Sequence, residues 1–191
     1  MKYVSLILFG VWVLAEMLSA QEGAAFAGRF VAAANYRTTQ SVRYDPAYAV
    51  LTYPGGDVPA DTGVCTDVVI RSYRAMGVDL QQLVHEDMRA NFSAYPGLWG
   101  LKRPDRNIDH RRVPNLQRFL ERQGAEVKGE ASSFLPGDLV AWDLNGNGLW
   151  HIGVVTGPDT FVHNIGNGPV AASGIRQWKI VGHYRWSGPK D

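Results

Sequence analysis

The sequence Asp61-Thr62-Gly63-Val64-Cys65-Thr66-Asp67 holds the only cysteine of this 191-residue chain. Turn-forming residues precede it at positions 53–59, and a helical pattern of apolar residues follows over 64–76 and stops at Gly77. Cys65 is therefore expected in the first turn of a helix, where unpaired backbone N–H groups and the positive end of the helix dipole lower the pKa of a thiol. A lone cysteine is either a small buried apolar residue or a reactive thiol, and its placement alone leaves both open.

The N-terminus has the layout of a secretory signal peptide. Lys2 precedes an apolar run over 3–14, and small residues lead up to a cleavage site expected after Ala20. The apolar run is too short to span a bilayer comfortably, and no cysteine follows the cleavage site to carry a lipid anchor. The sequence therefore predicts a periplasmic or secreted protein with no stable membrane anchor after cleavage; an uncleaved anchor helix is the alternative.

Length and composition favour one exported domain. Removal of 20 of the 191 residues leaves 171, enough for a single substantial core. We expect a signal peptide over 1–20, an N-terminal extension over 21–43 and a catalytic domain over 44–191. The net charge of +1 gives no reason to expect a nucleic-acid partner. One cysteine cannot form an internal disulfide, and a free thiol in an oxidising compartment favours a chemical role for Cys65.

The order of predicted elements indicates an α+β fold, because helices come first and strands joined by tight turns come second. Asp67 and Arg71 lie four residues apart on one predicted helix and are expected to pair. The predicted helices are one ending near Asn35, 64–76, 80–90 capped by Asp79, and one from Pro114 to just before Gly124. The predicted strands are a short one at 48–53 and an antiparallel set at 139–142, 149–156, 161–163 and 180–184.

Two histidines are expected to meet in a hairpin of this sheet. His151 begins one predicted strand and His163 ends the next, and the tight turn Gly157-Pro158-Asp159 joins them. The start of one hairpin strand faces the end of the other, so the two imidazoles should be near each other. Such a pair is either part of a metal site or a base with the group that orients it. With Cys65 as the nucleophile, His151 as the base and His163 as the orienting group, the requirements of thiol catalysis are met.

A metal site is the weaker interpretation. No third ligand lies at clear ligand spacing from the histidine pair. The segment 143–148 matches the start of a calcium-binding loop, but Val154 occupies the position that needs a bidentate carboxylate, and a hairpin turn is expected instead. We therefore expect no metal and no cofactor.

Several phrases of the sequence resemble known families. Pro136-Gly137-Asp138-Leu139-Val140 and His151-Ile152-Gly153-Val154 are similar to phrases of the NlpC/P60 cell-wall peptidases of the papain-like superfamily. More closely, the chain resembles the DUF1287 family over roughly 44–186, on Gly63-Val64-Cys65-Thr66-Asp67, the segment 107–116, His163-Asn164-Ile165-Gly166 and Gly182-His183-Tyr184-Arg185. The chain departs from the usual D-C-S-G at the nucleophile, and its Cys65-to-His151 separation is longer than is usual in NlpC/P60 domains, with the excess within 80–112.

The resemblance implies a papain-like α+β domain that hydrolyses an amide bond in peptidoglycan stem peptides or a similar peptide. By analogy with a tyrosine found upstream in NlpC/P60 domains, Tyr53 is expected to be a second oxyanion donor beside the Cys65 backbone N–H. In the basic stretch 102–112, Arg106, Arg111 and Arg112 either bind substrate carboxylates or pack against neighbouring acids. An acyltransferase or transpeptidase of the same fold, and a non-catalytic wall-binding module, are the alternatives.

Overall fold

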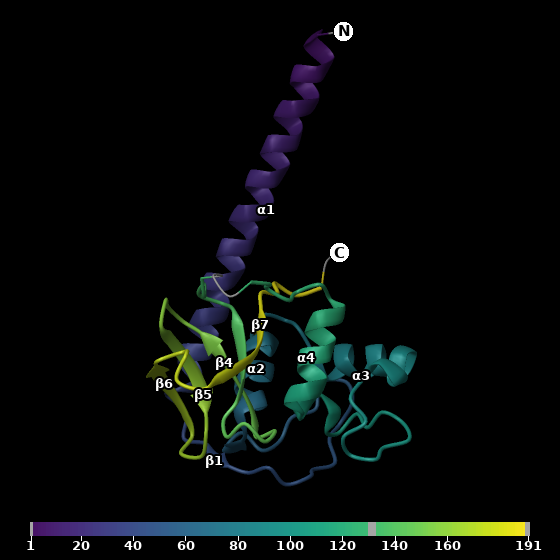
Figure 1. The fold of residues 1–191 in the computed structure, drawn as a ribbon, viewed down its shortest axis with the longest axis vertical. Coiled ribbons are helices and arrows are strands. Elements are labelled where there is room, and N and C mark those ends of the chain that lie inside the picture. Colours follow the sequence, from purple (N-terminus) through teal and green to yellow (C-terminus); the bar gives the residue numbers. More distant parts are fainter. Residues whose placement is uncertain (1, 130–132, 190–191) are drawn as a thin grey trace.

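The computed structural model describes residues 2–129 and 133–189, and these form an α+β fold (Figure 1). The α-helices are α1 (Lys2–Arg37), α2 (Cys65–Arg74), α3 (Leu80–Asn91) and α4 (Val113–Arg122), with short 3-10 helices η1 (Phe92–Ala94) and η2 (Asp109–Arg111). The strands are β1 (Arg43–Tyr44), β2 (Thr62–Gly63), β3 (Leu139–Asp143), β4 (Trp150–Val155), β5 (Thr160–Asn164), β6 (Pro169–Ser173) and β7 (Lys179–Tyr184).

The C-terminal strands form one five-stranded antiparallel sheet in the order β6-β5-β4-β3-β7. The expected helix-then-strand order and the hairpin between β4 and β5 are thereby confirmed. The segment 144–149 joins β3 and β4 as a tight connection, with the Leu144 N–H bonded to the Leu149 carbonyl. The hairpin turn expected there is confirmed.

Alternation along the strands divides the buried residues between the two faces of the sheet. Leu139 and Ala141 of β3 belong to the main core with α2 and α4, whereas Val140 and Trp142 belong to a second cluster with Phe161. Figure 1 shows α2 beside the sheet and α3 and α4 farther from it. Because α2 packs against β4, the residue that begins α2 is held at the start of that strand.

The helix α1 (Lys2–Arg37) ends close to the expected residue Asn35, but it also includes the segment that is predicted to be the signal peptide. Its last turns are anchored, since Phe30 and Ala34 are fully buried and the Phe30 ring lies 4.3 Å from that of Tyr73 on α2. Figure 1 shows its N-terminal portion projecting away from the sheet and the other helices. The cleavage site expected after Ala20 falls within α1 and stays a prediction. Among the described residues, no helix combines the length and apolar character needed to cross a membrane.

Two strand assignments differ from the sequence-based expectation. The segment 48–53 is a loop, not a strand, because side chains satisfy its backbone: Leu51 N–H donates to Asn107 Oδ1 at 2.9 Å, and Gln81 Nε2 donates to the Thr52 carbonyl at 2.9 Å. The edge strand β6 is not predicted by the sequence pattern. It starts with Pro169 and most of its side chains are exposed or half-buried, so it carries neither the propensity nor the apolar alternation of a buried strand.

Candidate active site

Cys65 is the first residue of α2, as expected from the sequence. Its thiol is buried between the helix and the sheet. The backbone N–H groups of Ile152 on β4, of Thr66 and of Cys65 itself lie near the sulfur and act to lower the pKa of the thiol. The sulfur is thus fixed beside the backbone of the residue that follows His151.

The expected lowering of the Cys65 pKa is wrong for this protein. Burial, with a smaller contribution from the negative charge of Asp67, raises the pKa of the Cys65 thiol to about 11. The backbone donors of Ile152, Thr66 and Cys65 act in the opposite direction but are outweighed. Loss of hydration penalises the thiolate more than a helix N-terminus stabilises it. The free protein therefore holds Cys65 as a neutral thiol at neutral pH.

The histidine pair expected from the hairpin is confirmed. His151 Nε2 lies 2.8 Å from His163 Nδ1, and both side chains are buried. This hydrogen bond uses Nε2 of His151 and leaves Nδ1 as the ring nitrogen for a reacting group. Within the described part of the chain, no hydrogen bond joins either imidazole to Cys65, and no group of three His, Cys, Asp or Glu side chains is arranged to hold a metal ion.

Aromatic side chains surround the histidine pair and account for its electrostatics. The His151 ring stacks on Trp142 at 5.8 Å, and the His163 ring lies 5.9 Å from Trp178. Burial lowers the pKa of His151 to about 3, with a smaller contribution from the charge of His163. Burial also lowers the pKa of His163. Both imidazoles are therefore neutral at neutral pH, because burial penalises the charged form.

A pocket of about 390 Å³ opens beside Cys65. Its volume is at the small end of the range for ligand-binding cavities, about 300–1,000 Å³. Its walls are mostly aromatic or apolar, with two arginines. The lining residues are Tyr44, Pro46, Tyr48, Val64, Cys65, Trp99, Ile108, Arg111, Arg112, Val113, Pro114 and Trp150.

Tyr53, the expected second oxyanion donor, lies outside this pocket. Its hydroxyl donates to Glu86 at 3.4 Å, and the Arg106 guanidinium lies over its ring at 5.7 Å. Arg106 is likewise absent from the pocket wall. Tyr44 lines the pocket instead, carried there by the parallel pairing of β1 with β2 just before Cys65. Burial raises the pKa of Tyr44, and the nearby Cys65, which repels a phenolate when ionised, is the second cause of that shift.

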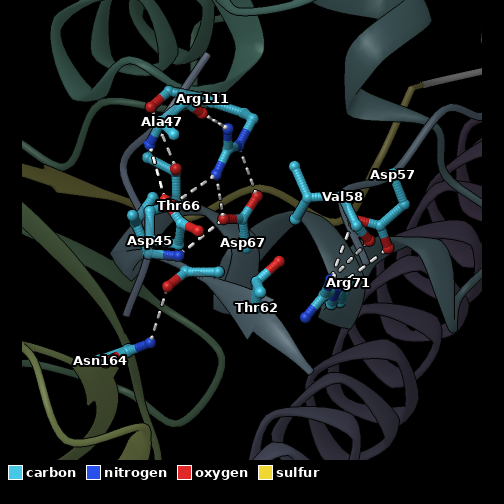
Figure 2. Close-up of polar contacts among 12 residues, drawn as sticks. Asp45, Ala47, Asp57, Val58, Thr62, Thr66, Asp67, Arg71, Arg111 and Asn164 are labelled. Carbon is cyan, nitrogen blue, oxygen red and sulfur yellow. Dashed lines mark hydrogen bonds and ion pairs between the residues drawn. The ribbon is translucent and has the colours of Figure 1, made fainter. Parts of the chain in front are cut away.

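Asp67 does not pair with Arg71 as expected; its partner is Arg111. Arg111 Nε donates to Asp67 Oδ1 at 3.0 Å and Nη2 donates to Oδ2 at 2.9 Å (Figure 2). Arg71 instead binds Asp57, with Nε donating at 3.0 Å and Nη2 at 3.2 Å. Figure 2 shows Asp67 and Arg71 directed toward these separate partners. The i, i+4 rule describes exposed helix faces, whereas both side chains are buried here and their partners come from η2 and from the loop that holds Asp57.

Two further contacts tie the start of α2 to its surroundings. The Val64 N–H donates to Asp67 Oδ2 at 2.7 Å, so Asp67 satisfies a backbone donor at the helix N-terminus. Asn164, next to His163, donates from Nδ2 to the Gly63 carbonyl at 3.3 Å (Figure 2). The end of β5 is thereby attached to the strand that leads into Cys65.

The geometry defines a class of protein: an α+β domain with a buried cysteine at a helix N-terminus, packed on an antiparallel sheet that carries a histidine pair. A family model described as "Domain of unknown function (DUF1287)" matches residues 31–186. The chain therefore belongs to the DUF1287 family, as its sequence phrases indicated.

Two individual proteins are similar to this chain. The uncharacterized protein YijF of Escherichia coli (strain K12) is 53% identical over 151 residues, covering 75% of this chain and 73% of YijF. Among solved structures, NlpC1 from Trichomonas vaginalis matches with a TM-score of 0.47 and 16% identity. That match covers 82% of this chain and 44% of NlpC1, so the chain spans less than half of NlpC1.

Proposed function

We propose that this protein is an exported cysteine hydrolase that cleaves an amide bond in peptidoglycan stem peptides or a similar peptide. One observation carries the proposal: the Cys65 thiol lies against the backbone N–H of Ile152, and the adjacent His151 is hydrogen-bonded to His163 at 2.8 Å. The predicted signal peptide and the similarity of the His151 phrase to cell-wall peptidases support the location and the substrate class.

In this mechanism a neutral thiol reacts with the help of a neutral base. His151 Nδ1 takes the thiol proton as Cys65 Sγ attacks the amide carbonyl carbon, and the tetrahedral intermediate then collapses to a thioester. His151 returns the proton to the departing amine. A water molecule, deprotonated by His151, then attacks the thioester and releases the carboxylic acid and the thiol.

Neither His151 nor His163 lines the Cys65 pocket, and the His151 ring packs on Trp142, which belongs to the second cluster. The mechanism therefore requires the His151 ring to move when substrate binds, so that Nδ1 reaches the sulfur. No hydrogen bond joins the two groups in the free protein, as far as the chain is described, and catalytic hydrogen bonds commonly tighten only in the substrate complex. His163 is then a positioning residue. Its Nδ1 accepts a hydrogen bond from His151 Nε2–H, which fixes the tautomer and orients the ring as the imidazolium forms.

Tyr44 replaces Tyr53 as the proposed second oxyanion donor, with the Cys65 backbone N–H as the first. The support is its place in the wall of the pocket that contains Cys65. A phenol next to the nucleophile can donate to the developing oxyanion, and loss of one such donor commonly costs about 10²–10³ in kcat.

The decisive experiment is digestion of purified peptidoglycan with the mature protein, with products identified by mass. Wild type is expected to release fragments from a single kind of amide bond, whereas Cys65→Ala should release none. His85→Ala is a matched histidine control, because His85 is half-buried against Tyr53 and lies outside the Cys65 pocket. It should cleave like wild type.

The same experiment separates the alternatives. Fragments that carry an added amine in place of water indicate an acyltransferase or transpeptidase. Binding of wild type and Cys65→Ala to the insoluble wall with no fragments released indicates a non-catalytic module. Equal digestion by both proteins would overturn the role of Cys65.

A further inference from the structure

Arg111 and Arg112 are consecutive and both line the pocket beside Cys65, but among the described residues Arg111 makes four hydrogen bonds to the protein and Arg112 makes one. Besides its two bonds to Asp67, Arg111 donates from Nη1 to the Ala47 carbonyl and from Nη2 to the Asp45 carbonyl, each at 3.4 Å. Its side chain is buried in an ion pair. Four of the five N–H donors of Arg111 are therefore used within the protein, which gives this residue a structural role.

Arg112 is held in place while most of its donors stay unused. Its guanidinium lies over the Trp99 ring at 4.1 Å, and Nη1 reaches Asp109 Oδ1 only at 3.5 Å. In the part of the chain that the structure describes, Nε and Nη2 of Arg112 donate to no protein group. The other oxygen of Asp109 already accepts the Asp105 backbone N–H. The planar face of the guanidinium is fixed by the indole, and the edge that can bind a carboxylate remains available.

The rest of the pocket favours an anion at this edge. No aspartate or glutamate is among the described residues of its wall. The positive charge of Arg111 is paired with Asp67 at 2.9 Å through a bidentate contact, whereas Arg112 reaches its counter-ion Asp109 through one nitrogen at 3.5 Å, so its Nε–Nη2 edge can take a second carboxylate. Val113 and Pro114, which begin α4, also line the pocket, and the positive end of that helix dipole acts in the same direction.

We propose that Arg112 binds a carboxylate of the substrate next to the scissile amide, through a bidentate contact from Nε and Nη2, and thereby selects peptides with a free acid at that position. The inference rests on the proposed function, because it places that carboxylate in the pocket that also contains Cys65. Trp99 holds the guanidinium plane ready, so little side-chain freedom is lost when the carboxylate binds. Arg112 is a specificity-determining residue in this scheme.

The test uses the synthetic stem peptide L-Ala-γ-D-Glu-diaminopimelate-D-Ala and versions of it in which one carboxylate at a time is a carboxamide. Wild type is expected to lose about 10- to 100-fold in kcat/KM on one of the carboxamides, the range expected for a charge-assisted bidentate contact. Arg112→Gln should cleave that carboxamide and the free acid equally well. Arg112→Lys keeps the charge without the planar fork and should discriminate by an intermediate factor.

Arg176→Gln is the matched control. Arg176 is also an arginine stacked on an aromatic ring, Phe134 at 4.8 Å, but it lies outside the Cys65 pocket. This variant should discriminate like wild type. Should Arg112→Gln fail to fold, judged by its thermal unfolding, the Arg112→Lys comparison carries the test.

Binding separates a failure of this inference from a failure of the proposed function. Affinities of the same peptides are measured by calorimetry on Cys65→Ala, with and without Arg112→Gln. Hydrolysis of every carboxamide as fast as the free acid overturns the role of Arg112 and leaves the hydrolase proposal standing. An Arg112-dependent preference for the free acid in binding, with no hydrolysis by wild type, supports the carboxylate site and overturns the hydrolase. Neither hydrolysis nor discrimination overturns both.

Discussion

Two pairs of buried ionisable side chains near the start of α2 differ in their charge state. His151 and His163, 2% and 3% exposed, form a pair with no opposite charge between them, and burial lowers the pKa of both. Asp67 and Arg111, 3% and 7% exposed, form a bidentate ion pair. Similar burial therefore yields a neutral pair in one place and a charged pair in the other.

The two pairs differ in whether their charge is compensated inside the protein. A buried charge is tolerated only where a partner and further hydrogen bonds compensate for lost hydration, and Asp67 has both Arg111 and the Val64 N–H. That pair fastens the end of the 92–112 stretch, and with it one wall of the pocket, to α2. For the histidine pair burial is the main cause of the shifts, so both imidazoles stay neutral, and the proposed proton transfer to His151 requires substrate binding to change these surroundings.

The largest effect on stability is expected when the carboxylate of the charged pair is removed. Asp67→Ala leaves Arg111 buried and unpaired and should lower the free energy of unfolding by about 3–5 kcal/mol, measured by urea denaturation. Asp57→Ala is the matched control: it removes the carboxylate partner of Arg71, which keeps its bonds to the Val58 and Pro59 carbonyls, and should cost less. An equal loss in the two variants would contradict a special role for the Asp67–Arg111 pair.

The rate at which Cys65 reacts with an alkylating reagent tests whether the thiol is neutral. With a thiol pKa of about 11, alkylation by iodoacetamide at pH 7.5 should be about 10- to 100-fold slower than for an unperturbed cysteine. The rate should rise with pH up to at least pH 10, because the thiolate fraction rises. The same protein in urea provides the reference rate. A fast reaction that is already independent of pH near neutrality would show a preformed thiolate–imidazolium pair instead.

The neutral state of His151 also predicts how stability depends on acid. The His151 pKa is about 3 in the folded protein and near 6.5 when unfolded, so the unfolded chain binds more protons between these values. The stability from neutral His151 is complete above about pH 6.5 and is lost as the pH falls toward 3. The melting temperature of His151→Asn should therefore fall less than that of wild type between pH 6.5 and 4. Parallel curves for the two proteins would rule out a neutral buried His151.

Local patterns in the sequence were sufficient for much of the fold and for part of the site. The helix that begins at Cys65 and the hairpin that joins His151 to His163 follow from apolar periodicity and turn residues, which act over a few positions. The α+β order and membership of the DUF1287 family were also predicted correctly. The loop at 48–53 and strand β6 were not, because tertiary hydrogen bonds and an edge position determine them rather than local propensity.

The sequence by itself determined which residues begin α2 and which histidines pair, because helix starts and hairpins are set by neighbouring residues. Only the tertiary structure decided that Tyr44 rather than Tyr53 lines the pocket, that Asp67 pairs with Arg111 rather than Arg71, and that burial raises the Cys65 pKa. It also separated two adjacent arginines, one engaged by Asp67 and the other stacked on Trp99. These outcomes depend on hydration and on partners distant in the chain, and residue spacing carries no information about either.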